Sequence, residues 1–599
     1  MTEAEAAPEP QTKTPEASPP SRAVSPPSRV RALARRALEQ WDRVLAVLAA
    51  SVLALSFGFD YGADNQLIYL LKSLAIANPG ILEKDWYASE VTHYHPVFAW
   101  LGAALIALNR DGWAVAITQM LLITLATTFM YETLRALAPK RLALAGFLCA
   151  LPLMIETRTS SVAVSYAFDA YLQPSALGSL GLFGAIAMFV RGNFLASGIW
   201  VGIAGLFHAN YLILSIPTFG LMHLFLGLKG LPRRLLLNLG PLCIAAIPVL
   251  PVIVATATSP DAARAQEILF SIRSPHHYSP GQFYKALAPF AGWQMFGVGL
   301  GSVLFRGKRS PGARFGIALS ALMALVWIGS GFSTVAYVPR VVQLFVWRFA
   351  PYIDMLSAAV GCLVLVRIAV EPGFARRISP ALLALAVGGL VVVGTFQTER
   401  KNPFWFMLFV VAAALLAWCV YSGLELAKRW VRLLRFEQGW LRHGPSVVLA
   451  LSLAFMVQTS LDELEGIPRN SSLLREGGAK SDDLLDWMRN ETPIDAVFLT
   501  PPDVDTFRFY GQRAIVVDWK STPMVPGELV EWHRRLNDVC GRRVESRRDL
   551  RGYDELDRSE LDRLKARYHL SYAVVSRGNE RKLGYETVFK NHRYAVVKL

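Results

Sequence analysis

The most constraining feature of this sequence is a series of long apolar stretches separated by charged connections. A helix that crosses a bilayer needs about 20 mostly apolar residues, and thirteen stretches approach that length. Only 18% of the 599 residues are charged, against about 25% in a typical soluble protein. This composition excludes a disordered chain, a coiled coil and an ordinary cytosolic enzyme. We therefore predict an α-helical polytopic membrane protein with about thirteen transmembrane helices. The predicted spans are 43–59, 113–134, 141–156, 176–190, 194–208, 211–228, 235–256, 291–305, 314–334, 353–370, 379–396, 403–424 and 445–461.

Basic residues between the predicted spans indicate how the chain is oriented. Cytoplasmic connections of membrane proteins are enriched in Lys and Arg, and with the N-terminus inside, all six even-numbered connections are basic. This agreement requires that the apolar stretch 96–109, which begins with Pro96, lies in the outer interface instead of crossing. The connections account for the net charge of +15, so no nucleic-acid partner is expected. We predict a bacterial inner-membrane protein with a cytoplasmic N-terminus and a periplasmic C-terminus.

The chain divides into three regions by composition. Residues 1–28 are rich in Pro, Ala, Ser and Glu, which predicts a disordered cytoplasmic tail. Residues 29–461 form the predicted transmembrane region, whose first periplasmic loop, 60–112, is long. Residues 462–599 have the composition of a soluble domain, in which strand patterns such as 496–500 alternate with helical ones. We therefore expect a periplasmic α/β domain at the C-terminus.

The first periplasmic loop opens with two carboxylates, Asp60 and Asp64, directly after the first span. Residues four apart are neighbours on a helix, so the two would share a face if the segment is helical. A carboxylate at the mouth of a membrane bundle costs free energy unless it takes part in function or is paired with a cation. Asp60 and Asp64 are therefore candidate catalytic residues. In the alternative interpretation, Asp60 caps the helix that follows and Asp64 is simply solvated.

In its arrangement the chain resembles the GT-C superfamily of membrane glycosyltransferases, which includes oligosaccharyltransferase catalytic subunits, protein O-mannosyltransferases and the aminoarabinose transferases of lipid A. The resemblance rests on one span, a long outer loop that opens with Asp60, an interfacial helix, further spans and a C-terminal α/β domain. The chain also resembles a bacterial multi-pass family, which implies the fold but no substrate. In the superfamily, an acidic residue of the first outer loop acts as the base or positions the acceptor, and Asp60 and Asp64 are the matching positions. The Trp-Trp-Asp-Tyr-Gly motif of oligosaccharyltransferases is absent from the tail, where the nearest stretch is 510–513, so N-glycan transfer is not expected.

Arginines on the predicted outer face are candidates for binding a lipid phosphate. The resemblance implies a sugar donor linked to polyprenyl phosphate, and cations must stabilise the phosphate that leaves. Arginine suits this role because it binds phosphate through two parallel hydrogen bonds. Three arginines qualify, Arg273, Arg340 and Arg348, and the last two would lie about two turns apart on a helix. The alternative is that these side chains reach toward lipid head groups without a specific ligand.

Further polar residues on the predicted outer face are candidates for substrate binding. Their alternatives are ordinary loop residues, helix caps or members of an interfacial aromatic belt. Adjacent histidines point in different directions and no Glu stands at a spacing that completes a zinc site, so no metal is predicted. Asp503 and Asp505 leave a divalent cation open, and no other cofactor is expected. The substrate-binding candidates are Asp85, His93, His95, Asp169, His208, His276 and His277.

The predicted function is transfer of a sugar from a polyprenyl-phosphate-linked donor to an acceptor at the periplasmic face. The expected partners are the lipid-linked donor and membrane lipids. Two alternatives stay open: a non-enzymatic protein that flips or exports a lipid-linked glycan, and a scaffold of the same fold without activity. A transporter is expected to carry charges or broken helices near mid-membrane, whereas the predicted spans carry few charges, which favours the enzyme. The sequence does not reveal the donor sugar, the acceptor or the oligomeric state.

Overall fold

The computed structural model describes most of the chain from residue 40 onward. Two predictions fall outside the described residues, namely the cytoplasmic tail 1–28 and the span 403–424. The described residues are 40–396, 446–474 and 483–599, without residues 94, 157–161, 306, 308, 337, 372–373, 375–376, 448, 455, 459, 462–463 and 468–470.

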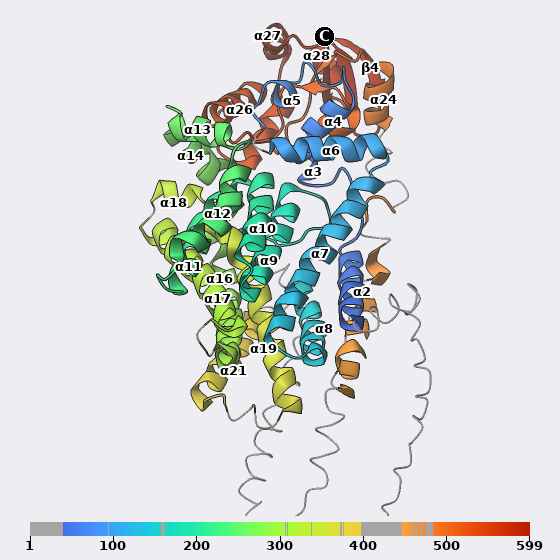
Figure 1. Cartoon of the computed structure of the whole chain (residues 1–599). Coiled ribbons are helices and arrows are strands. Elements are labelled where there is room, and N and C mark those ends of the chain that lie inside the picture. The colour runs from blue at the N-terminus through green and yellow to red at the C-terminus, as the bar shows by residue number, and fades with distance from the viewer. Residues whose placement is uncertain are drawn as a thin grey trace, which may run out of the picture.

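A bundle of apolar helices makes up the larger part of the molecule (Figure 1). Within the described residues, five helical segments are long and apolar enough to cross a membrane, or six if a bent pair counts as one span. The chain is therefore a helical membrane protein, but the predicted number of thirteen spans is not confirmed. Several predicted spans coincide with shorter helices, such as α10 with 14 residues, which is about 21 Å long. The bundle helices are α2 (Trp41–Ser56), α7 (Trp113–Leu137), α8 (Lys140–Glu156), α9 (Pro174–Arg191), α10 (Phe194–Phe207), α11 (Ala209–Phe225), α12 (Leu231–Ala246), α13 (Leu250–Thr258), α16 (Pro280–Gly301), α17 (Pro311–Ser330), α19 (Ala350–Val370) and α21 (Pro380–Phe396).

Prolines account for two differences from the predicted spans. The span predicted at 235–256 is divided into α12 and α13, which meet at 76°. Pro248 and Pro251 lie at the break, and proline disrupts the hydrogen bonding of a helix interior. Similarly, α16 begins at Pro280 instead of at residue 291, because proline is favoured in the first turn of a helix.

The bundle packs closely through small residues. Helices α9 and α19 lie at its centre and are buried along nearly their whole length. A Cβ atom added to Gly181 on α9 would lie 2.6 Å from the carbonyl oxygen of Trp200 on α10. Membrane helices associate mainly by packing, so such glycines allow their backbones to approach.

Short elements connect the bundle helices at the end that carries the C-terminal segment. Figure 1 shows α6 lying across this end of the bundle, crosswise to α7, as an interfacial helix would lie. The apolar stretch 96–109 thus forms a helix that does not run along the bundle. The connecting elements are α3 (Gln66–Tyr69), α4 (Leu71–Ala77), α5 (Trp86–Ser89), α6 (Pro96–Leu108), η1 (Val162–Val164), α14 (Ala262–Glu267), η2 (Ile268–Arg273), α15 (Pro275–Tyr278), α18 (Pro339–Gln343) and η5 (Val346–Phe349).

Residues 483–599, here called the tail segment, contain a five-stranded sheet and several helices. The strand order is β2-β1-β3-β5-β4; β1 pairs in parallel with β2 and β3, and β5 pairs antiparallel with β3 and β4. β4 was not predicted, because its residues are mostly exposed and lack an apolar run. The elements are α24 (Asp483–Glu491), β1 (Val497–Leu499), α25 (Phe507–Gly511), β2 (Ala514–Ile515), α26 (Pro526–Val539), η7 (Arg547–Glu555), α27 (Arg558–Tyr568), β3 (Tyr572–Ser576), α28 (Glu580–Leu583), β4 (Glu586–Lys590) and β5 (Tyr594–Lys598).

Candidate functional site

Arg348 is the central residue of the candidate site. It lies in η5, the 3-10 turn that leads into α19, and the turn starts at Phe345 with a left-handed φ of +47°. The guanidinium stacks over the Phe345 ring at 5.0 Å. Its Nε is buried without a hydrogen-bond partner, and within the described part of the chain no carboxylate pairs with it. A half-buried cation that has no carboxylate partner favours the binding of an anion.

Two histidines that cap helices lie close to Arg348. His95 stands at the N-terminus of α6, and His208 caps α11, where its Nδ1 accepts a hydrogen bond from the backbone N–H of Asn210 at 3.3 Å. Their ring centroids are 4.8 Å apart. Burial, followed by the neighbouring His93 and the charge of Arg348, lowers the pKa of His95 to about 3. His95 is therefore neutral at pH 7 and adds no second positive charge to the site.

The third histidine beside Arg348 comes from the outer connection before α16. Nδ1 of His277 lies 2.7 Å from the carbonyl oxygen of Ala163, and its ring meets Phe345 edge-on at 5.4 Å. Burial, and then the neighbouring His276 and Arg348, lower the pKa of His277 to about 3. The structure thus gathers Phe345, His95, His208 and His277 around Arg348, and we call these five residues the Arg348 cluster.

A chain of hydroxyl groups continues from this cluster into the bundle. The Tyr211 ring lies 5.1 Å from that of His208, and its hydroxyl is hydrogen-bonded to that of Tyr352. The Tyr352 hydroxyl lies 2.6 Å from Oγ of Ser179, which donates to the carbonyl oxygen of Ala167 at 2.6 Å. The chain holds α9, α11 and α19 in register beneath the site. Sequence analysis missed these hydroxyls, because a tyrosine or serine within an apolar stretch gives no distinguishing signal.

Asp60 and Asp64 do not share a helix face, because the segment between them is not helical. The helix begins only at Gln66, and Asp64 has a left-handed φ of +44°. Asp60 is half-buried, and its Oδ1 accepts a hydrogen bond from the backbone N–H of Ser472 at 2.7 Å. Asp64 is exposed and forms an ion pair with Lys520 of the tail segment. Lys520 reaches Asp64 because the tail segment folds back over the first loop.

Asp169 lies near Asp64, with Tyr171 between them. The Tyr171 hydroxyl donates to Oδ2 of Asp64 at 3.0 Å, and Asp169 accepts a hydrogen bond from the side chain of Gln173. Burial, and then the charges of Asp169 and Asp64, raise the pKa of Tyr171. A backbone bridge between Asp60 and Tyr171 brings this connection beside the first loop. Two of the predicted carboxylates, those of Asp64 and Asp169, therefore lie beside Tyr171, and the backbone of Asp60 pairs with it.

Asp85 is not available to a substrate in this structure, because both of its oxygens are engaged. Oδ1 caps α5 by accepting from the N–H of Ala88 at 2.8 Å. Oδ2 accepts from Nε of Arg508 at 2.8 Å and from the N–H of Ile515 at 3.0 Å. Arg508 also pairs with Asp518, and all three charged side chains are at most 2% exposed. These contacts attach the first loop to the tail segment.

The three predicted phosphate-binding arginines are separated in the structure. Arg273 donates from Nε to the Thr522 hydroxyl at 2.8 Å, so it joins η2 to the tail segment. Arg340 is exposed on α18. The left-handed Phe345 interrupts the helix between Arg340 and Arg348, so the two do not lie two turns apart on one helix.

The other two histidine candidates lie outside the Arg348 cluster. His93 is half-buried in the first loop, and burial, followed by the charge of Lys72, lowers its pKa to about 4. The ring of His276 lies 4.1 Å from that of His277, and burial, followed by Arg273, lowers its pKa. We find no group of three or more His, Cys, Asp or Glu side chains in the described residues that could hold a metal ion.

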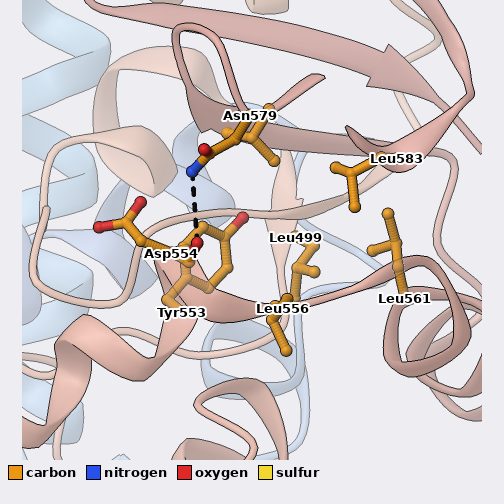
Figure 2. Close-up of a pocket in the computed structure, with 8 residues that line it drawn as sticks. Leu499, Tyr553, Asp554, Leu556, Leu561, Asn579 and Leu583 are labelled. Atoms are coloured by element: carbon orange, nitrogen blue, oxygen red, sulfur yellow. Dashed lines mark hydrogen bonds between the residues drawn. The ribbon is translucent and has the colours of Figure 1, made fainter. Parts of the chain in front are cut away.

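A small pocket in the tail segment is too narrow for a sugar. Figure 2 shows it between Leu499, Leu561 and Leu583, with Asn579 donating a hydrogen bond to the carbonyl oxygen of Asp554 at 3.3 Å. Its volume of about 10 Å³ is close to that needed for one water molecule.

Comparison with known proteins gives structural similarity over most of the chain. A domain of unknown function, DUF6798, matches residues 479–539, and a search of curated proteins finds no significant match. ArnT from Cupriavidus metallidurans bound to undecaprenyl phosphate is similar at 17% identity and a TM-score of 0.47, over 93% of this chain and 97% of that chain. The archaeal oligosaccharyltransferase AglB from Archaeoglobus fulgidus, in complex with an inhibitory peptide and a dolichol-phosphate, is similar at 14% identity and a TM-score of 0.46, over 90% of this chain and 70% of that chain.

The structure search thus returns members of the GT-C superfamily, which the sequence also resembles. The superpositions are loose, with TM-scores below 0.5 and identities below 20%. We therefore infer function from the residues of this chain.

Proposed function

We propose that this chain is a membrane glycosyltransferase that transfers a sugar from a polyprenyl-phosphate-linked donor to an acceptor. The observation that carries the proposal is Arg348, whose guanidinium is half-buried without a carboxylate partner in the described residues. A buried cation without a partner is costly in the free protein, and binding of a phosphate would offset that cost.

The groups around Arg348 fit a lipid phosphate better than a soluble anion. The aromatic ring of Phe345 provides apolar contact for a lipid. The single N–H of neutral His277 donates to the carbonyl oxygen of Ala163, so Arg348 is the group of the cluster that would donate to the phosphate. Arginine would hold the phosphate in the donor and stabilise the charge that develops when the sugar leaves. The cluster lies at the end of the bundle under the tail segment, where a lipid tail in the bilayer and an acceptor in water would meet.

We assign the general base to Asp60. A base must accept a proton from the acceptor hydroxyl, so at least one oxygen must be available. Oδ1 of Asp60 is oriented by the N–H of Ser472, which directs the carboxylate without engaging both oxygens. Asp64 is instead held by Lys520 and Tyr171, which suits a role in positioning the tail segment or the acceptor.

The proposed contact between Arg348 and the phosphate is tested by measuring the binding of undecaprenyl phosphate to the purified full-length protein. Arg348→Gln should weaken binding about tenfold or more, as expected for the loss of a charge-assisted hydrogen bond. Arg348→Lys should restore part of the affinity, because Lys keeps the charge but not the planar fork. The matched control is Arg340→Gln, which removes the same charge from an exposed site and should leave binding unchanged. Equal losses in the two Gln variants would show that both arginines act only on lipid head groups.

We also propose that the tail segment and the candidate site lie on the periplasmic side of a bacterial inner membrane. Reporters fused after Leu599 and at Lys308 test this orientation. The first should report the periplasm and the second the cytoplasm, in agreement with the distribution of basic residues. A cytoplasmic reporter signal after Leu599 would reverse the assignment.

A further inference from the structure

The turn that carries Arg348 interrupts a helix. In a continuous α-helix, the backbone N–H of Arg348 would donate to the carbonyl oxygen of Leu344, four residues earlier. Phe345 lies between α18 and η5 with a left-handed φ of +47°, and the N–H of Arg348 donates instead to the carbonyl oxygen of Phe345 at 3.0 Å. The carbonyl group of Leu344 therefore loses its helical donor. A left-handed residue other than glycine persists only where its surroundings hold it in place.

Asn210, in the first turn of α11, supplies the donor that the turn lacks. Its Nδ2 donates to the carbonyl oxygen of Leu344 at 3.0 Å, although the two residues are 134 positions apart along the chain. A carbonyl oxygen can only accept, so the side-chain amide must present its nitrogen to the turn. This bond attaches the start of α11 to the backbone directly before Phe345.

Asn210 also contacts the Arg348 cluster through its own backbone. Its N–H donates to Nδ1 of His208 at 3.3 Å, so the imidazole caps α11 and is held in one orientation. One residue of α11 therefore fixes two parts of the cluster, namely the ring of His208 and the turn that leads to Arg348.

The other contacts of the turn act on side chains. The rings of His277 and Tyr278 lie 5.4 and 5.5 Å from that of Phe345, so they orient this ring without bonding the peptide groups. Gln343 accepts a hydrogen bond from Gln266 at 3.2 Å, but this bond is exposed, so water can replace it at little cost. Among these contacts, the amide of Asn210 is the one that holds the peptide backbone.

We propose that Asn210 is a positioning residue, which holds the interrupted helix so that the guanidinium of Arg348 faces its ligand. The inference rests on the proposed function, in which Arg348 binds the phosphate of the lipid donor. In this role Asn210 acts through Arg348 and does not bind the phosphate itself. Loss of its Nδ2 leaves the carbonyl oxygen of Leu344 without that donor and lets the strained turn relax. A cation that stabilises developing charge must be held in place before the reaction.

Chemical labelling of Arg348 tests the positioning without any ligand. The purified full-length protein in detergent is treated with phenylglyoxal, which modifies accessible arginines, and the modified peptides are measured by mass spectrometry. Asn210→Leu keeps the approximate size of the side chain but removes the donor, so it should raise the labelling of Arg348 several-fold. Asn210→Gln keeps an amide and should restore part of the protection.

Asn238→Leu is the matched control for the labelling. Nδ2 of Asn238 donates to the carbonyl oxygen of Phe194 at 3.3 Å, at the end of α10 that is remote from His208. The substitution removes the same kind of bond and should leave the labelling of Arg348 unchanged. Unchanged labelling in Asn210→Leu, or an equal rise in Asn238→Leu, would overturn the proposal.

A double-mutant cycle tests whether Asn210 acts through Arg348. Asn210→Leu should weaken the binding of undecaprenyl phosphate about tenfold, as expected for the loss of one hydrogen bond. In the Arg348→Gln background the same substitution should cause little further loss, because the effects of coupled residues do not add. Additive losses would show a separate structural role and overturn the proposal. If Arg348→Gln alone leaves binding unchanged, the proposed function fails, and the labelling of Arg348 still decides whether Asn210 holds the turn.

Discussion

Two arginines of this molecule are shielded from water but differ in their partners. Arg508, in the attachment between the first loop and the tail segment, is 2% exposed and lies between Asp85 and Asp518. Arg348, at the end of the bundle, has a buried Nε without a hydrogen-bond partner and no carboxylate partner in the described residues. Both side chains also contact an aromatic ring, Tyr87 at 5.4 Å and Phe345 at 5.0 Å, so packing does not distinguish them.

The difference indicates which charges hold the structure and which are available for a ligand. A buried cation that is fully paired contributes to stability through its partners, and removing one partner leaves an uncompensated charge. A cation without a carboxylate partner has no such structural dependence. The same contrast separates two carboxylates: both oxygens of Asp85 are engaged by named donors, whereas Asp60 is oriented through Oδ1. The predictions below test this division between structural and reactive charges.

The largest expected effect is the loss of transfer in Asp60→Asn. Asn keeps the size of the side chain but cannot accept the proton, and loss of a general base typically slows a reaction about 10²–10⁴-fold. Sugar transfer is measured in membranes or with extracted lipid donor, and thermal unfolding should change little. Asp64→Asn is the matched comparison and should have a smaller effect. Full activity of both variants would transfer the catalytic assignment to Asp169.

The next effect is on stability and separates the two arginines directly. Arg508→Met should lower the free energy of unfolding by about 3–5 kcal/mol, because two buried carboxylates lose their cation. Arg348→Met should cause no such loss, because it removes no partner from a carboxylate. Chemical unfolding and limited proteolysis of the tail segment measure the difference. Lys84→Met, which breaks an exposed pair with Asp495 across the same attachment, serves as the control and should leave the unfolding midpoint unchanged. Equal destabilisation by the two Arg→Met variants would contradict the division.

The smallest effect is a pH dependence from His95. Its pKa is about 3 in the folded protein against an ordinary value of 6.5, so the unfolded chain takes up the proton first as the pH falls. This contribution to stability is complete above pH 6.5 and is lost between pH 6.5 and 3, at about 1.4 kcal/mol per pH unit. His95→Gln should flatten the fall in thermal stability between pH 7 and 5, whereas His592→Gln, at an exposed position, should not. An unaltered slope in His95→Gln would mean that His95 is already solvated in the folded protein.

Sequence patterns were most informative where one physical requirement dominates. A helix that spans a membrane must be long and apolar, and this requirement predicts helices such as α7 and α9. Pro96 marks the start of the crosswise helix α6. The patterns were least informative about lengths and breaks. Neither the bend between α12 and α13 nor the left-handed Phe345 follows from hydrophobicity. Among the site candidates, Arg348, His95, His208 and His277 come together, but residue type alone did not separate them from exposed Arg340 or buried Asp85.

The sequence by itself determined that this chain is a helical membrane protein, because the bilayer requires long apolar segments whose backbone groups are satisfied internally. It also limited the reactive groups to the polar residues between those segments. Only the tertiary structure decided which of these groups are already paired. Asp85 and Arg508 are 423 positions apart along the chain, and no local pattern links them. A charge becomes structural or reactive according to the partners that folding brings within hydrogen-bond distance, and those partners come from remote parts of the chain.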